Sequence, residues 1–350
     1  MVTTAMTPHL RVLEPGLYTT VQDLGRAGFQ ALGVPVAGAL DFVGLRLANA
    51  TVGNPRDAAC LEVLYQGPTL EVIAEAVTVA LAWGEAQIEA PSGGARRLPP
   101  WQSATLVKGE RLRIGPLKGS SCGYLAVAGG FDLPRVMGSW ATYGRGGIGG
   151  YRGRALAAGD ALPLAEAAPR QDHWRLPNPP NPGLGEPIHV VLGPQADYFT
   201  PEALATLTQT AFAISPQADR MGLRLTGATL AHRDSYNIAS DAIAPGAIQV
   251  PGNGQPIVLL ADRHTAGGYP KIATVISADL PLLGRRRPGD TVGFARLEVE
   301  EAEDRRRRLE TQLDTWCQQL EPVAGDGGID VAALHRNNLI SGVVDGRGAE

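Results

Sequence analysis

The chain has 350 residues, a net charge of −4 and a pI near 5.9. Its length suggests about two domains, and the absence of excess positive charge argues against nucleic acid as a partner. The 44 glycines and 27 prolines, spread between short apolar runs, favour a mainly β protein with many turns.

Two features indicate the cellular compartment. Cys60, Cys122 and Cys317 are far apart and form no C-x-x-C pair, which is typical of free thiols in a reducing cytoplasm. The N-terminal residues lack the basic segment and apolar core of a secretory signal, and no run of about 18 apolar residues occurs. We therefore expect a soluble, cytoplasmic protein without a membrane segment.

The chain begins with two short predicted strands, at 10–13 and 16–21. A loop rich in turn residues follows, and it carries Gln22, Asp23 and Arg26. The apolar spacing after this loop predicts a helix within 40–54. Asp41 lies at the start of that helix, where its charge would complement the helix dipole, so we interpret it as a helix-start residue in preference to a catalyst.

The pattern from Cys60 to Leu164 is that of β-strands. Glu62 lies within one of these strands and points away from its apolar neighbours Leu61 and Val63. It is either solvent-facing or a buried carboxylate that needs a partner, and we take the solvent-facing position as the expectation.

Two stretches imitate catalytic motifs without their structural context. The sequence from Gly119 to Gly123 matches G-x-S-x-G, but a strand is predicted after it where a nucleophile elbow needs a helix. The glycines at 144–149 match G-x-G-x-x-G without the flanking strand and helix of a dinucleotide site. The sequence also has no Walker A lysine, no H-E-x-x-H and no cysteine ligand set, so we predict no metal.

A proline-rich segment divides the chain. Five prolines and two glycines in 175–187 precede a new apolar strand, which suggests a linker because proline is excluded from helix interiors and central strands. We predict an N-terminal β lobe at 1–175, a linker at 176–187, a C-terminal β lobe at 188–299, and a helix and tail at 300–350.

The second half contains two predicted helices. Thr200 before Pro201 resembles an N-cap with proline at the first helical position, which predicts a short helix at 201–209. A long helix is predicted at 299–320, where the basic run 305–308 is balanced by acidic neighbours and indicates a solvated face. Beyond Glu321 the chain is weakly patterned and is interpreted as a tail that is loose or docked on a partner.

The stretch 246–277 carries the main candidate site. Two apolar strands are predicted at 256–260 and 272–276, and a polar segment around a Gly-Gly pair joins them. Polar side chains beside such a pair suit a binding loop, and the alternative is an ordinary turn. The polar and glycine residues concerned are Asp262, Arg263, His264, Thr265, Gly267, Gly268, Tyr269 and Lys271.

Long motifs resemble one family. They include TTVQDLGRAGFQALGVPVAGALD, YLAVAGGF, GPQADYF, DRMGLRLTG and GAIQVPGNGQPIVLLADRHTAGGYPKIATVISADL. Over 10–298 the chain resembles the C subunit of prokaryotic 5-oxoprolinase, a family also described as allophanate hydrolase subunit 2 or KipA-like. The family is similar to part of the carboxyltransferase region of urea carboxylase.

The resemblance implies a mainly β protein with cyclophilin-like barrel character in two lobes. It implies two partners, one Kip-inhibitor-like (the B subunit) and one LamB/YcsF-like (the A subunit), with ATP as cosubstrate for opening 5-oxo-L-proline to L-glutamate. Such a reaction needs cations against developing negative charge and a carboxylate for proton transfer. We therefore take Asp262 and Lys271 as candidate catalytic residues. The candidate substrate-binding residues are Gln22, Asp23, Arg26, Arg263, Thr265, Gly267, Gly268 and Tyr269.

Two alternatives come from other classes of function. The chain could transfer a carboxyl group from carboxybiotin to urea or a similar small amide; it has no biotin-attachment motif of its own, so a separate carrier would be required. It could instead be a non-catalytic binding subunit that, with the Kip-inhibitor relative, regulates a kinase.

Overall fold

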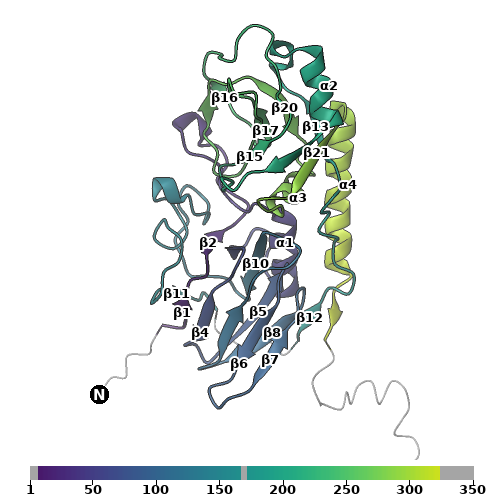
Figure 1. Cartoon of the computed structure of the whole chain (residues 1–350). Coiled ribbons are helices and arrows are strands. Elements are labelled where there is room, and N and C mark those ends of the chain that lie inside the picture. Colours follow the sequence, from purple (N-terminus) through teal and green to yellow (C-terminus); the bar gives the residue numbers. More distant parts are fainter. Residues whose placement is uncertain (1–6, 167–171, 324–350) are drawn as a thin grey trace, which may run out of the picture.

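The computed structural model describes residues 7–166 and 172–323, and most of the predicted tail, 324–350, lies outside them. Figure 1 shows an N-terminal lobe of sheets, a barrel beyond it, and one long helix that runs beside both. The predicted mainly β architecture is confirmed.

Two antiparallel sheets form the N-terminal lobe. The first has six strands, in the order β11 (Ala161–Pro163), β1 (His9–Glu14), β4 (Thr69–Val72), β9 (Arg111–Ile114), β6 (Ala86–Glu89) and β7 (Ala95–Leu98). The second has five, in the order β2 (Tyr18–Gln22), β3 (Cys60–Leu64), β10 (Cys122–Val127), β5 (Ala76–Ala82) and β8 (Ser103–Val107). Alternating apolar residues of both sheets, such as Leu10, Leu61, Leu70 and Leu125, form one buried core.

The helix α1 (Phe42–Thr51) covers the second sheet on its other face. Its Leu45 and Leu47 pack with Tyr124 of β10 in a separate core cluster. Asp41 is the N-cap, and its Oδ1 accepts hydrogen bonds from the amides of Val43 (3.0 Å) and Gly44 (3.1 Å). The prediction of Asp41 as a helix-start residue is confirmed.

The C-terminal lobe is a closed seven-stranded barrel of the cyclophilin-like kind, as expected. Its strands follow the order β13 (Ile188–Leu192), β20 (Lys271–Val275), β17 (Ala247–Gln249), β18 (Ile257–Leu259), β15 (Gly222–Thr226), β14 (Ala211–Ile214) and β21 (Thr291–Arg296). The strands predicted at 256–260 and 272–276 are therefore confirmed as β18 and β20. Buried apolar residues such as Val190, Phe212, Ile248 and Phe294 fill the barrel.

Helices and short elements complete the described chain. Thr200 caps α2 (Pro201–Gln209) as predicted, and its Oγ1 accepts from the amide of Ala203. The predicted long helix is α4 (Val299–Gln318); Arg305, Arg307 and Arg308 are exposed on it, while Arg306 lies over the ring of Phe42. The remaining elements are α3 (Leu280–Gly284), the 3-10 turns η1 (Gln30–Leu32), η2 (Gly144–Gly146) and η3 (Ala196–Tyr198), and the strand pairs β12 (Trp174–Arg175) with β22 (Glu321–Pro322) and β16 (Asp241–Ala242) with β19 (Ala266–Gly267). No helix within the described ranges is both long and apolar enough to cross a membrane.

Candidate functional site

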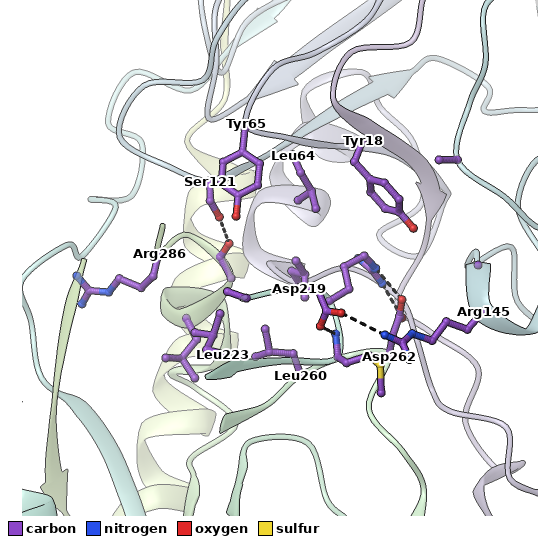
Figure 2. Close-up of a pocket in the computed structure, with 18 of the residues that line it drawn as sticks. Tyr18, Leu64, Tyr65, Ser121, Arg145, Asp219, Leu223, Leu260, Asp262 and Arg286 are labelled. Carbon is purple, nitrogen blue, oxygen red and sulfur yellow. Dashed lines mark hydrogen bonds and ion pairs between the residues drawn. The ribbon is translucent and has the colours of Figure 1, made fainter. Parts of the chain in front are cut away.

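A cavity of about 490 Å³ lies where the N-terminal lobe meets the barrel. Its walls come from both lobes, and Figure 2 shows their side chains surrounding the hollow. The N-terminal lobe supplies Tyr18, Leu64, Tyr65, Ser121, Arg145 and Arg154, and the barrel side supplies Asp219, Arg220, Leu223, Leu260, Asp262 and Arg286. A pocket at a contact between lobes, with several polar groups converging on it, is the usual location of a binding site.

Arg220 is the centre of a buried ion cluster at this cavity. Its Nε and Nη2 donate to Oδ2 and Oδ1 of Asp262, each at 3.0 Å, and its Nη1 is ion-paired with Glu62. Nη2 also donates to the carbonyl oxygen of Gly38 at 2.7 Å. Burial by itself lowers the pKa of the Arg220 guanidinium, but the carboxylates of Asp262 and Glu62 outweigh burial and raise that pKa. The Arg220 cation is therefore permanent, and it fixes the orientation of Asp262.

Glu62 is fully buried, so the expectation that it faces solvent is wrong. Its Oε2 accepts hydrogen bonds from the hydroxyl of Tyr124 (2.7 Å) and the amide of Leu40 (2.8 Å). Strand alternation does turn Glu62 away from the core between the sheets. The other face of this sheet is covered too, by α1 and by the loop that carries Arg220, so the carboxylate meets a cation there instead of water.

A second buried ion pair joins the lobes beside the first. Nε and Nη2 of Arg285 donate to Oδ2 and Oδ1 of Asp41 at 2.7 and 3.0 Å. The indole Nε1 of Trp83 donates to Asp41 at 2.6 Å, and the guanidinium of Arg285 lies 4.3 Å from the centre of the Trp83 ring. Asp41 thus caps α1 and also ties the N-terminal lobe to the end of α3.

The cavity lining carries more positive than negative charge. Four arginines line it, Arg145, Arg154, Arg220 and Arg286, against the two aspartates Asp219 and Asp262. A partly enclosed hollow with this charge balance favours a small anionic ligand, because neighbouring apolar walls weaken solvent screening. Tyr18 adds a hydroxyl at the edge, and burial is the main cause of the raised pKa of this phenol.

Asp160 positions Arg154 at the cavity wall. Its Oδ2 and Oδ1 accept from Nη1 and Nη2 of Arg154 at 2.7 and 2.8 Å, and Oδ2 also accepts from the amide of Ala157. The hydrogen bonds from Arg154 are the main cause of the lowered pKa of the Asp160 carboxyl.

Asp160→Asn will lower the free energy of unfolding by about 1–3 kcal/mol at pH 7, because charged hydrogen bonds to a buried carboxylate are lost. The folded pKa of Asp160 lies below its unfolded value, so its contribution is complete above the unfolded carboxyl pKa of about 4 and is lost as the pH falls through the folded pKa. Urea titrations at a series of pH values should show the difference from the parent protein shrinking below about pH 4. The exposed Lys108–Glu75 pair provides a control, since Glu75→Gln should cost less than about 1 kcal/mol at every pH. If the difference in unfolding free energy between Asp160→Asn and the parent protein stays constant across the pH range, the lowered pKa of Asp160 does not stabilise the fold.

The structure separates the two candidate catalytic residues. Asp262 lines the cavity. Lys271 is buried on β20, where its Nζ donates to Oδ2 of Asp241 at 2.7 Å and to the carbonyl of Ala242 at 3.2 Å, and it is not part of the cavity lining. Asp262 pairs with Arg220 and Lys271 with Asp241, so the two residues have no partner in common.

Gln22, Asp23 and Arg26 are buried in the N-terminal lobe outside the cavity lining. Asp23 accepts from the amides of Gly25 and Trp140 and from the hydroxyl of Ser139. Arg26 donates to the carbonyls of Val136 and Ala141, and Gln22 donates to Thr20 and to the carbonyl of Thr142. In the described structure these side chains hold the loop at 136–142 against β2.

The predicted binding residues near Lys271 lie on the barrel next to the β16–β19 pair. Arg263 donates to the carbonyls of Ile243 and Leu260, and burial lowers its pKa to about 10. Gly267 pairs with Asp241 in that ribbon, while Tyr269 is exposed. The carbonyls of Thr265 and Gly268 accept backbone hydrogen bonds. Neither glycine of the Gly-Gly pair has a positive φ. A Cβ at Gly267 would meet the ends of the Gln249 and Ile243 side chains.

Several cavity residues are not evident from the sequence. Asp219 and Arg220 stand in a stretch whose charges alternate with apolar residues, but nothing local distinguishes them from a solvated strand edge. Arg145 lies in η2, and Arg154 and Tyr65 lie in loops. Tyr65 adopts a left-handed backbone with φ of 63°, which sequence does not signal for a tyrosine. Ser121 belongs to the rejected G-x-S-x-G match, and the strand β10 begins directly after Ser121, where a nucleophile elbow would need a helix. The Oγ of Ser121 donates to the carbonyl of Gly284.

Within the described ranges, no group of three or more His, Cys, Asp and Glu side chains is arranged to hold a metal ion. The chemistry that the described cavity offers is that of guanidinium groups and two carboxylates, of which Asp262 is oriented by Arg220.

Comparisons with known proteins agree on one family. The model for the carboxyltransferase domain, subdomain A and B, matches residues 32–296. The C subunit of 5-oxoprolinase from Escherichia coli strain K12 is 37% identical over 295 residues, which is 84% of this chain and 93% of the relative. The urea amidolyase of Lachancea kluyveri is 31% identical, with 89% of this chain matching 18% of that larger protein.

A solved structure supports the same placement. The crystal structure of the Kluyveromyces lactis urea amidolyase has a TM-score of 0.79 and 27% sequence identity, covering 90% of this chain and 20% of that one. The chain therefore belongs to the carboxyltransferase-domain family that contains the C subunit of 5-oxoprolinase together with a segment of urea amidolyase.

Proposed function

We propose that this chain is the C subunit of a complex that couples ATP hydrolysis to opening of 5-oxo-L-proline to L-glutamate. The observation that carries the proposal is the cavity between the lobes, with four arginines and an oriented Asp262 in its lining. The substrate is a small ring with one carboxylate, which fits the size and charge of that hollow. The similarity to the C subunit of 5-oxoprolinase across 84% of the chain supports the same assignment.

The reaction sets demands that these residues can meet. A lactam is a poor electrophile, so its oxygen would first attack the γ-phosphorus of ATP and release ADP. Water then adds to the activated carbon, the C–N bond breaks as the nitrogen takes up a proton, and a second water hydrolyses the acyl phosphate. The arginines would hold the substrate carboxylate and developing negative charge, and Asp262 would accept a proton from water. Arg220 would act as a positioning residue that aims Asp262.

The complex would contain two further subunits, one Kip-inhibitor-like and one LamB/YcsF-like. The presence of these two subunits and the use of ATP as the cosubstrate are both part of the proposal. The role first predicted for Lys271 remains a prediction. If Lys271 acts, it does so from the β16–β19 side of the barrel, where Asp241 pairs with it.

A second candidate is transfer of a carboxyl group from carboxybiotin to a small amide such as urea. The specific observation in its favour is the match of 89% of the chain to urea amidolyase and the carboxyltransferase-domain model over 32–296. Here the amide nitrogen would form a bond to the carboxyl carbon as biotin leaves. The chain would need a separate biotin carrier.

Reconstitution separates these candidates. The purified chain, combined with both partner subunits, should convert 5-oxo-L-proline and ATP to glutamate and ADP in equal amounts, and omission of any one component should stop turnover. A complete complex that leaves 5-oxoproline intact would refute the proposal. Consumption of carboxybiotin in the presence of urea by this chain and its Kip-inhibitor-like partner would favour the second candidate.

A further inference from the structure

A second hollow, of about 820 Å³, lies on the N-terminal lobe. Its basic side is formed by β6, β7 and β9 and the loop after β9. The strands β6 and β7 lie at the end of the lobe remote from the barrel (Figure 1), whereas the loop reaches the residues after α3, because Arg287 donates to the carbonyls of Leu117 and Ser120. Trp83 and Trp101 form its floor, and Pro179, Pro180 and Pro182 of the proline-rich linker form one wall. We call this hollow the basic groove, after its four cationic lining residues Arg96, Arg97, Arg113 and Lys118.

The positive charge of the basic groove is only partly neutralised. Arg97 pairs with Glu85 at 2.5 Å, and Glu85 is the one acidic residue in the lining. Arg96 pairs with Glu110 outside the groove. Arg113 and Lys118 have no ion pair or side-chain hydrogen bond to any described residue. An acidic protein with a net charge of −4 therefore concentrates unpaired cations at one place.

Strand register shows that this concentration is local. One row across the outer face of the first sheet alternates in sign, because Glu71 of β4 lies opposite both Arg11 and Arg111, and Arg111 lies opposite Glu89. The next exposed row, two residues along β9, has one carboxylate, Glu14, at its β1 end: Thr69 lies between Glu14 and Arg113. Beyond Thr69, Gln87 lies between Arg113 and Arg97. The charged residues of the alternating row lie outside the groove, whereas the part of the second row that lines it, Gln87, Arg97 and Arg113, has no carboxylate.

The apolar side of the basic groove is rigid. Trp83 and Trp101 both have a left-handed backbone, with φ of 60° and 63°, and their rings meet edge to face with centroids 4.7 Å apart. Non-glycine residues in this region are strained and persist only where the surroundings fix them. Trp83 is fixed by Asp41 and Arg285, which belong to the ion pair between the lobes. The floor is therefore preformed, so little ordering remains for a ligand to impose.

We infer that the basic groove binds a small molecule carrying a polyphosphate chain. Arg113 and Arg97 flank Gln87 across two strand spacings, so their backbones are about 9–10 Å apart. A chain of linked phosphates supplies several charged acceptor oxygens along that length, so one ligand can contact both cations. Inorganic triphosphate and a nucleoside triphosphate share this chemistry. The inference deepens the proposed function and rests on it, because ATP is the polyphosphate that the complex would consume.

Binding to the full-length chain alone tests the inference without any 5-oxoproline. Titration calorimetry would use sodium triphosphate, ATP and adenosine as separate ligands, with tryptophan emission as a second readout because Trp83 and Trp101 form the floor. We expect saturable binding of triphosphate and ATP that weakens as salt rises. Arg113→Gln with Lys118→Gln should weaken binding about tenfold or more, since two charged contacts are removed.

Arg111→Gln is the matched control. Arg111 lies on the same strand and face as Arg113, but in the row compensated by Glu71 and Glu89, and its variant should bind within about twofold of the parent chain. Equal affinity for triphosphate and ATP would assign recognition to the phosphates alone, and tighter binding of ATP would place the nucleoside in the groove as well; both outcomes support the inference.

Three outcomes would overturn the inference. They are the absence of saturable triphosphate and ATP binding, unchanged affinity in the Arg113→Gln/Lys118→Gln variant, and an equal loss in Arg111→Gln, which would mean attraction to surface charge in general. The proposed function would survive each of them, because ATP could bind elsewhere in the complex. A complex that binds ATP here but leaves 5-oxoproline intact would refute the proposed function and retain the groove.

Discussion

Arg220→Ala will lower the free energy of unfolding by about 3–5 kcal/mol, the usual cost of removing one partner from a buried ion pair. Arg220 is 5% exposed and compensates two carboxylates, Glu62 and Asp262, that are themselves buried. Its removal leaves both carboxylates without their cation, and Glu62 is fully buried, so water cannot take the place of the guanidinium there. Urea denaturation followed by circular dichroism would measure the loss.

Two further variants make this prediction specific. Arg145→Ala removes another arginine from the same cavity, but the Arg145–Asp219 pair is more than half exposed at 3.4 Å, so the cost should be below about 1 kcal/mol. Glu62→Gln in the Arg220→Ala background removes one of the uncompensated charges and should recover part of the lost stability. A loss in Arg220→Ala no larger than that in Arg145→Ala would show that the cluster does not stabilise the contact between the lobes.

Asp262→Asn will reduce 5-oxoproline-dependent ATP hydrolysis by the reconstituted complex by about 100-fold or more, the usual effect of losing a group that transfers protons. The amide keeps the shape of the side chain but cannot accept a proton from water at neutral pH. Release of glutamate and ADP would be measured at saturating substrate. The expectation rests on the proposed function and on the position of Asp262 in the cavity wall.

Glu62→Gln is the matched control for this second prediction. Glu62 and Asp262 are both buried and both paired with Arg220, but only Asp262 lines the cavity. A purely structural role would make the two variants equally inactive, whereas a catalytic role leaves Glu62→Gln with much more turnover than Asp262→Asn. Wild-type turnover in Asp262→Asn would remove this carboxylate from the chemistry.

Lys271→Met decides the remaining catalytic candidate in the same assay. The substitution keeps the aliphatic stem and removes the ammonium group that pairs with Asp241. Retained turnover would assign Lys271 to the structure of the barrel near the β16–β19 ribbon. Lost turnover with an unchanged urea unfolding curve would show that Lys271 takes part in the reaction. It would also imply that Asp241 moves away from Lys271 during the reaction.

Local sequence patterns predict the elements well. Apolar runs bounded by glycine or proline mark β18 and β20, and the Thr200-Pro201 pair marks the start of α2. Asp41 is identified at the start of α1 from its place before an apolar helical pattern. Each of these signals depends on residues within a few positions of one another, so it can be recognised without knowledge of the fold.

The candidate site is predicted only in part, because its members come from different lobes. The polar segment after β18 does contain a cavity residue, Asp262, since polar side chains just beyond a buried strand often line a site. Sequence patterns miss Arg220, although it holds Asp262 and reaches Glu62, 158 residues earlier in the chain. The polarity of Gln22, Asp23 and Arg26 indicates a binding loop. In the described structure these residues hydrogen-bond the backbone of a neighbouring loop, and their role in substrate binding stays a prediction.

The amino-acid order alone determined the mainly β class, the main strands and the caps of α1 and α2, because periodicity and capping act between near neighbours along the chain. The long motifs also determined the family. Only the tertiary structure decided which charges are buried and which face each other. Glu62 shows why: alternation along β3 turns its side chain away from the core between the sheets, but whether water or Arg220 lies on the other side depends on how the barrel packs against the sheet.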